Sequence, residues 1–465
     1  MKFKLFSESP LIVFILLPEL SAFNSSFALA RRLRTRGFRI LYGGPQNFQE
    51  HVLAQGFSYE LLEISKPDFA KQENQLGSLR RWSLRRRQIR YYRRESRLML
   101  DRCVASFQQM NPALVLLDPL FWPYAELPLR CGVPIVAFNT SFASSFNPQV
   151  PPAFCGLMPG NPRLGRVRLR NGLAWGRRIL TVGSRLWYFE KIVPLLHGLL
   201  PGHSAIQRIE RLGGRLCWSE YGPRLVLPEL VVAPRELDLP QLVASNDRTY
   251  IGACVDLARK DGDFDWGDLD PQRPLLYCSL GTYSHVYPHA RRLFSAVVDV
   301  LRRRPDLQGI VQVGTAAETD NFGPLPTNIR ILKHAPQIEV LARASLFITH
   351  GGLSSVRESL QFGVPMIVFP CWMEQPGNAV RVVHHGLGLR GNIAQVTFDQ
   401  LLALIERVEQ GDFQPALRRM KAIFEAQSGC QAGVDFIEAF LDRQKAQRPL
   451  KAAIRPLSGS SAELV

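Results

Sequence analysis

The chain has 465 residues, of which 46% are hydrophobic and 21% charged, with a formal charge of +17. This composition excludes a largely disordered chain, and the length suits two or three domains. The eight cysteines are scattered, with no Cys-x-x-Cys pair and no Cys/His cluster at zinc spacing. We therefore expect reduced thiols, no structural metal and a cytoplasmic protein.

The N-terminal segment has the pattern strand, loop, helix, strand. Residues 11–17 form a short apolar run, which is typical of a strand buried on both faces. Two lysines before this run also resemble a secretion signal, but Pro18 and Glu19 end the run early and argue against one. Apolar residues at helical spacing over 27–33 predict a helix, and residues 38–42 predict the next strand.

The same alternation of strands and helices continues and then restarts. Further strands are predicted at 114–117, 134–138, 275–279, 309–313, 346–349 and 365–369, with helices at 120–129 and 293–301. Such alternation is typical of doubly wound parallel sheets and predicts the α/β class.

An acidic stretch rich in Asp, Gly and Pro, residues 256–274, separates the two halves. We expect one domain over 1–245, a linker over 246–272 and a second domain over 273–443. The polar tail, 444–465, is expected to be disordered.

Two stretches account for most of the net positive charge. Residues 80–102 contain ten arginines and only two acidic residues, and residues 163–187 contain seven arginines and no acid. Aromatic and aliphatic residues interleave with both. A solvated surface is one interpretation, and peripheral contact with an anionic membrane is another. Nucleic-acid binding is disfavoured because no recognition motif is present.

The most informative segment begins with a glycine turn after the strand predicted at 346–349. His350 precedes Gly351 and Gly352, which let the backbone approach a ligand closely. Ser354 and Ser355 are candidate N-cap residues for the helix that follows. A helix N-terminus after a glycine turn favours phosphate, because its free N–H groups and its dipole attract an anion.

Carboxylate and amide groups follow at matching positions. Glu358 lies one turn into that helix, where a carboxylate can accept bonds from ribose hydroxyls. Glu374 and Gln375 fall in the loop after the strand predicted at 365–369, where an acid beside an amide can hold sugar hydroxyls. Ligands of open α/β sheets bind at these carboxyl ends of strands.

In order and spacing, residues 334–379 resemble the donor-binding signature of the UDP-glycosyltransferase superfamily, and most of the chain is weakly similar to it. The resemblance implies two facing Rossmann-like domains with a cleft between them, the glycosyltransferase B-type architecture. The first domain would bind the acceptor and the second the nucleotide sugar. It also implies an inverting, metal-independent transfer that uses no cofactor besides the sugar donor.

The resemblance assigns donor contacts residue by residue. His350, Gly352 and Ser355 correspond to diphosphate contacts, and Glu358 corresponds to the ribose ligand. Thr282 lies in a second glycine turn, Ser279-Leu-Gly-Thr282, and would contact a phosphate.

The nucleobase and the sugar are assigned in the same way. His334 stands where many members have a tryptophan that stacks on the base, and Ala335 and Gln337 correspond to residues at the edge of the base. The residues that match the sugar-binding loop are Trp372, Glu374 and Gln375.

The N-terminal half departs from the family at one important position. The opening loop normally carries a Gly-His pair whose histidine deprotonates the acceptor, but here that position is Ala22. Asp118 matches the aspartate that usually pairs with this histidine, so it becomes the candidate base, directly or through water. Glu19 is a second candidate. An amine acceptor needs less help from a base than an alcohol, so an N-linked product stays open.

The leading hypothesis is therefore transfer of a hexose, specifically glucose, from UDP-glucose or a related nucleotide sugar to a hydrophobic or lipid-like acceptor. The apolar segment 138–157 lies where the family places its acceptors. A nucleotide-sugar-binding protein without activity is the alternative, because Ala22 cannot take a proton. A sugar-nucleotide epimerase is a third and less favoured reading, because epimerases lack this Glu-Gln loop.

Overall fold

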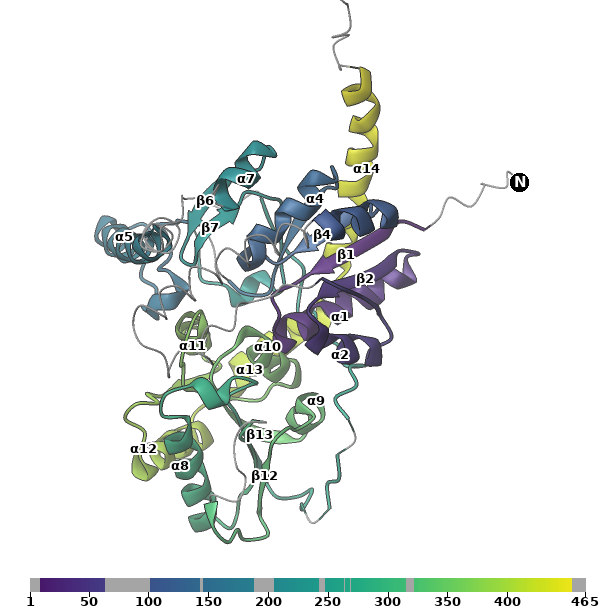
Figure 1. Ribbon diagram of the computed structural model, residues 1–465. Helices are drawn as coiled ribbons and strands as arrows, with labels where there is room; N and C mark the ends of the chain where they lie inside the picture. The colour runs from purple at the N-terminus through teal and green to yellow at the C-terminus, as the bar shows by residue number, and fades with distance from the viewer. Residues whose placement is uncertain are drawn as a thin grey trace, which may run out of the picture.

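The computed structural model describes residues 9–62, 101–142, 145–187, 205–241, 247–262, 264–267, 269–314 and 322–453. The chain folds into two α/β units, one above the other in Figure 1. The basic stretch expected at 80–102 lies almost entirely outside the described residues, whereas the second one, 163–187, lies within them.

Seven parallel strands form the first sheet, in the order β3-β2-β1-β4-β5-β8-β9. Their bounds are Leu11–Ile15 (β1), Arg39–Gly44 (β2), Ser58–Leu61 (β3), Leu114–Leu117 (β4), Ile135–Asn139 (β5), Glu229–Val231 (β8) and Arg248–Tyr250 (β9). The helices of this half are α1 (Leu20–Thr35), α2 (Gln49–Ala54), α4 (Glu126–Arg130), α5 (Gly165–Trp187) and α7 (Ala205–Arg211), with short 3-10 helices that include η2 (Pro119–Ala125) and η3 (Ala153–Cys155). A small antiparallel hairpin joins β6 (Leu216–Ser219) to β7 (Gly222–Leu225).

Six parallel strands form the second sheet, in the order β12-β11-β10-β13-β14-β15. Their bounds are Leu275–Ser279 (β10), Gln308–Gln312 (β11), Ile329–Leu332 (β12), Ala344–Thr349 (β13), Met366–Val368 (β14) and Gly388–Arg390 (β15). The helices are α8 (Ala290–Arg303), α9 (Gln337–Leu341), α10 (Leu353–Phe362), α11 (Gln375–His384), α12 (Phe398–Gln410), α13 (Gln414–Ala426) and α14 (Gln431–Ala453). Hydrophobic clusters cover both faces of this sheet.

The predicted α/β class with two Rossmann-like sheets is confirmed. The strands expected from continuous apolar runs are present, with ends within two residues of the expected positions. The first helix differs, because it begins at Leu20 rather than near residue 27, so Ala22 lies in its first turn and not in a loop. The N-cap residue of this helix is Glu19, whose side chain forms no capping hydrogen bond. Glutamate is not one of the residue types preferred at an N-cap, so the sequence does not mark this helix start.

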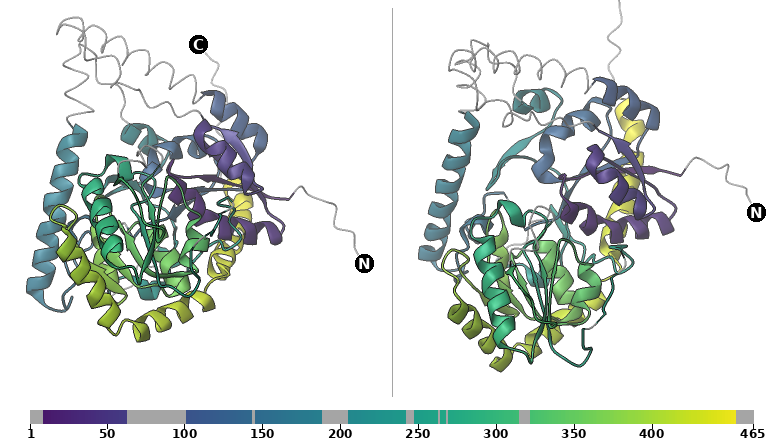
Figure 2. Two further views of the ribbon diagram at one scale, coloured as in Figure 1. Left: turned by 90° about the horizontal axis from the view of Figure 1, so that it is seen from below. Right: turned by 60° about the horizontal axis from the view of Figure 1, so that its bottom comes forward.

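The structure differs from the expected domain limits at the linker and at the C-terminal end. Strand β9 joins the first sheet although it lies inside the expected linker. Helix α14 leaves the second unit and packs on the first, where Val434 and Ile437 join the same buried cluster as Phe14. In Figure 2 it lies beside the N-terminal helices. The tail expected to be disordered from 444 continues this helix to Ala453.

The two units are tied together close to the start of α10. The buried Arg357 guanidinium donates to the carbonyl of Ala253 at 2.7 Å and to Ser25 Oγ of α1 at 2.6 Å. Ser25 Oγ also lies 2.6 Å from Ser354 Oγ. These contacts fix α1 against the N-terminal end of α10.

Candidate active site

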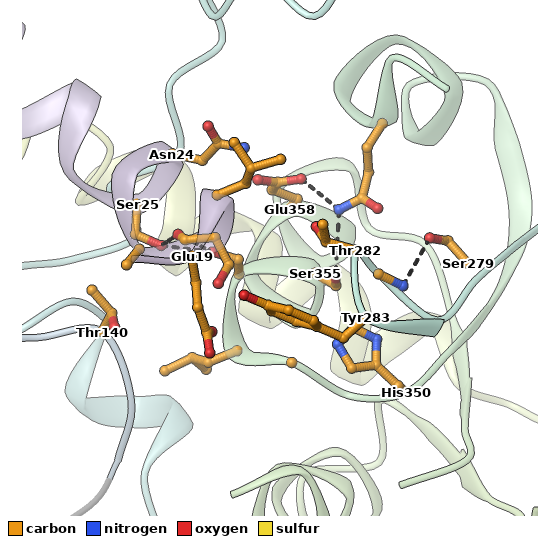
Figure 3. A pocket seen from close by; sticks show the side chains of 18 of the residues that line it. Glu19, Asn24, Ser25, Thr140, Ser279, Thr282, Tyr283, His350, Ser355 and Glu358 are labelled. Carbon is orange, nitrogen blue, oxygen red and sulfur yellow. Dashed lines mark hydrogen bonds between the residues drawn. The ribbon is translucent and has the colours of Figure 1, made fainter. Parts of the chain in front are cut away.

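A cavity of about 410 Å³ lies between the two units. It lies at the carboxyl ends of strands from both sheets, where open α/β sheets bind ligands. Figure 3 shows Asn24, Ser25 and Thr140 of the first unit on one side and Thr282, Tyr283 and His350 of the second on the other. Every predicted donor and sugar residue lines this cavity.

Two glycines allow the backbone to pass close to His350. A Cβ on Gly281, whose φ is +74°, would lie 2.8 Å from His350 Cε1, and a Cβ on Gly352 would lie 2.7 Å from Nε2. Among the described residues, His350 Nδ1 has no hydrogen-bond partner. Burial lowers the pKa of His350 to about 4, so the imidazole is neutral and able to donate one hydrogen bond to an anion.

The N-terminus of α10 faces the cavity, but its cap is not the one expected. The N-cap residue is Gly352, and neither Ser354 nor Ser355 takes that position. The hydroxyl of Ser354 instead makes a tertiary contact, with Ser25 Oγ of α1 in the other unit. Ser355 lines the cavity in the first helical turn, where Gln337 Nε2 donates to its hydroxyl at 3.3 Å. The N–H groups of this turn therefore stay available to a diphosphate.

Glu358 sits in a charged network that the sequence did not reveal. Arg259 Nη1 donates to Glu358 Oε1 at 2.6 Å, and Gln337 Nε2 donates to Oε2 at 2.7 Å. Arg259 also pairs with Asp261 at 2.7 Å, and its side chain is only 3% exposed. Glu358 Oε2 also accepts a longer bond from Arg259 Nη2, at 3.4 Å. Its Oε1 therefore keeps a lone pair for a ribose hydroxyl while these donors hold the carboxylate in place.

The far end of the cavity corresponds to the expected nucleobase site. His334 is exposed at its edge, Ala335 is buried behind it, and Gln337 begins α9. Asn24 of α1 also lines the cavity, and its Oδ1 accepts a 2.7 Å hydrogen bond from His51 Nε2.

The residues expected to bind the sugar lie in the loop between β14 and α11 and at the start of α11. Trp372 is half exposed, and Met373 has a positive φ of 56°. Gln375 Oε1 accepts from the backbone N–H groups of Cys371 and Trp372, both at 2.9 Å, and its Nε2 donates to Tyr287 Oη at 3.2 Å. The Gln375 amide therefore shapes this loop, and one N–H remains for a sugar hydroxyl.

The acceptor side contains Ala22 where the family has its histidine, and two carboxylates nearby. Asp118 is 2% exposed and does not line the cavity. It accepts from Leu120 N–H at 2.8 Å and from Thr140 Oγ1 at 3.5 Å, and both of these partners do line it. Glu19 lines the cavity directly, between Thr140 and Tyr283 in Figure 3.

Burial perturbs the acids around this junction. It raises the pKa of Asp118 to about 7, and the negative charge of Glu19 adds to the effect. Burial also raises the pKa of Glu374 to about 7, with Glu19, Glu220 and Asp118 contributing. Burial raises the pKa of Glu220 to about 7 as well. Glu19 therefore acts electrostatically on both the expected base and the sugar loop.

Several cavity residues were missed from the sequence. Arg259 and Asp261 lie in a stretch read only as an acidic linker, and the one signal was a basic pair, Arg259 and Lys260, inside it. Tyr283 and Tyr287 follow the glycine turn of β10 and carry no motif. Within the described ranges, no group of three or more His, Cys, Asp or Glu is placed to hold a metal ion.

Known proteins are similar to this chain in sequence and in fold. The family model described as UDP-glucoronosyl and UDP-glucosyl transferase matches residues 317–433. Demethyllactenocin mycarosyltransferase of Streptomyces fradiae is 24% identical over 92% of this chain and 86% of its own. The crystal structure of the glycotransferase of kitacinnamycin has a TM-score of 0.64 at 23% identity, over 93% of this chain and 99% of that one. The glycosyltransferase VinC, solved with dTDP, has a TM-score of 0.61 at 17% identity, over 93% and 100%.

The two α/β units with parallel sheets have the fold of the solved B-type glycosyltransferases. The segment 317–433 matches the UDP-glucoronosyl and UDP-glucosyl transferase family model, in the part of the chain whose sequence resembles that superfamily. The general activity that the relatives support is glycosyl transfer.

Proposed function

We propose that this enzyme moves a hexose, specifically glucose, from UDP-glucose to a hydroxyl group of a hydrophobic acceptor, with inversion at the anomeric carbon. The observation that carries the proposal is the shared cavity. It holds a prepared carboxylate, Glu358, and the anion-binding turn of His350 in one unit, and faces the carboxylate of Glu19 in the other.

The donor geometry supports a ribonucleotide. Glu358 is oriented by Arg259 and Gln337, and the lone pair that remains on its Oε1 suits a ribose hydroxyl. The diphosphate would lie on the N-terminus of α10 beside His350, which supplies the neutralisation that a metal ion supplies elsewhere. On this proposal the reaction needs no cofactor besides the sugar donor.

We propose Glu19 as the residue that meets the acceptor hydroxyl, with Asp118 behind it. Asp118 is the aspartate that the family resemblance selects, but Leu120 and Thr140 stand between it and the cavity. In the transfer, Glu19 accepts the hydroxyl proton and the acceptor oxygen forms a bond to the anomeric carbon. The bond from that carbon to the diphosphate breaks, and UDP leaves with the electron pair. Help of this kind is typically worth 10²–10⁴-fold in rate.

Apolar side chains line part of the cavity. Leu17, Leu20, Leu120, Trp372 and Met373 contribute to its lining. Removing apolar surface from water is the main driving force available there, which favours a hydrophobic acceptor such as a polyketide, sterol, carotenoid or glycolipid.

A second candidate function is donor binding without transfer, and the observation in its favour is Ala22, which is buried and cannot accept a proton. The two are separated by measuring UDP release from UDP-glucose with a panel of hydrophobic alcohols, phenols and amines. We expect acceptor-dependent release that falls at least about 100-fold in Glu19→Gln. The exposed Glu339→Gln serves as a matched control.

Three results decide between the candidates. Loss of activity in Asp118→Asn but not in Glu19→Gln returns the base to Asp118. Retention of activity with amines alone, in every variant, shows that no base is used. UDP-glucose binding without release for any acceptor supports the binding protein.

A further inference from the structure

Helix α5 exposes a stripe of large apolar side chains. Leu169, Leu173, Leu180 and Trp187 are 65%, 61%, 74% and 59% exposed. Their spacing of four, seven and seven residues places them on one face of an α-helix, within about 40° of one another around its axis. Solvated surfaces of monomeric proteins rarely present such a continuous apolar stripe without a partner.

The opposite face of α5 fixes this orientation. Trp175 is fully buried, and its Nε1 donates to the carbonyl of Val150 at 3.0 Å. Asn171 is also buried and donates to the carbonyl of Pro148 at 3.2 Å. Arg178 donates to the carbonyl of Glu220 at 2.7 Å. The helix is therefore held to the body of the enzyme by one side, and Figures 1 and 2 show it at the edge of the molecule.

Positive charge surrounds the stripe. Residues 163–187 contain seven arginines and no acidic residue, in a chain whose formal charge is +17. By helical geometry Arg166, Arg170 and Arg177 flank the leucines on one side. A second copy of the same helix would bring arginines against arginines, which argues against self-association through this face. An anionic partner that also accepts apolar side chains is complementary to it.

We propose that the outward face of α5, defined by Leu169, Leu173, Leu180, Trp187 and the arginines beside them, docks on an anionic lipid surface. The leucines and the indole enter the interface between headgroups and acyl chains, and the guanidinium groups bind lipid phosphates. Among the described residues no helix has the length and apolarity to cross a bilayer, so this contact is peripheral.

The position of α5 links this surface to the acceptor side of the cavity. Thr140 and Ser141 line the cavity, and the chain then runs through η3 to α5. Ala153 of η3 packs against Gly377 of α11, where a Cβ on the glycine would lie 2.6 Å from its Cα. The docking itself does not depend on the proposed reaction.

The test is flotation of the full chain with vesicles. Vesicles of phosphatidylglycerol and phosphatidylcholine in equal amounts are compared with phosphatidylcholine alone. We expect binding to the anionic vesicles at low salt, with an affinity that falls about tenfold or more in Arg166→Gln/Arg177→Gln. The triple variant Leu169→Ser/Leu173→Ser/Leu180→Ser should lose binding to a similar degree. Leu53→Ser, which changes a leucine of α2 that is 50% exposed, is the control.

Circular dichroism and UDP binding of each variant show that the fold is intact. Wild-type protein that ignores anionic vesicles, or a triple variant that binds them as tightly as Leu53→Ser, overturns the proposal. So does a dimer in size-exclusion chromatography that the triple variant abolishes, because the stripe would then bind a second copy of the chain. A preference for polyanionic RNA over vesicles, lost only in the arginine variant, also overturns it.

Discussion

Replacing Asp118 with Asn should stabilise the protein, and more so at higher pH. The folded-state pKa of Asp118 is about 7 and its ordinary value is 3.8. Because the pKa is raised, the folded state holds a proton that the unfolded chain releases, and stability falls as pH rises from about 4 to about 7. At about 1.36 kcal/mol per pKa unit, a shift of about three units costs roughly 4 kcal/mol at neutral pH. Between pH 5 and pH 8 the wild type should lose ~2–3 kcal/mol relative to the variant.

The assay is urea unfolding followed by circular dichroism at both pH values. Asn keeps an oxygen for the Leu120 N–H, and Thr140 can reverse its hydroxyl, so the local bonds survive. Glu339→Gln, at an exposed site, should show no such trend. A stability difference between wild type and Asp118→Asn that is the same at pH 5 and pH 8 would refute the reasoning, because the buried carboxyl would then be ionised throughout.

Three further predictions concern the donor site. Arg259→Met leaves the Glu358 carboxylate without its cation, and removing one partner of a buried pair costs about 3–5 kcal/mol. We therefore expect UDP binding, measured by calorimetry, to weaken. Arg259→Lys should restore part of the affinity. Unchanged affinity would show that Glu358 is not a donor ligand. Gly281→Ala forces a side chain into a φ of +74° and against His350, so UDP affinity should drop about tenfold or more. Because the pKa of His350 is about 4, wild-type UDP affinity should show no His350 titration between about pH 5.5 and pH 8. A tenfold loss of affinity through pH 6.5 that His350→Gln removes would show a protonated imidazole instead.

The strands and the donor turn could be predicted because their signals are local. Leu114–Leu117 and Leu275–Ser279 are continuous apolar runs, and such runs are buried wherever a parallel sheet is covered on both faces. Gly352, two residues after His350, is needed because a Cβ there would lie too close to the His350 ring, so this signal is also local.

The remaining features depend on contacts between distant segments. Ser354 looks like a helix cap in the sequence, but Ser25, 329 residues away, holds its hydroxyl. Arg259 reaches Glu358 across 99 residues, and nothing in its neighbourhood marks it as part of a binding site. Periodicity assigns an element to a class but does not say which surface covers it, so tertiary partners of this kind stay hidden.

Helix α14 has a consequence for any attempt to divide the enzyme. The first unit is not one continuous stretch of chain, because its core is completed by residues such as Val434 and Ile437 from the far end of the sequence. Arg36 of the first unit adds a two-pronged ion pair with Glu438, both bonds at 3.0 Å. A fragment cut after β9 would expose an apolar groove where helix α14 normally packs. A separate peptide of residues 431–453 should bind in this groove and cover it. Domain exchange between relatives would therefore have to move the two ends of the chain together.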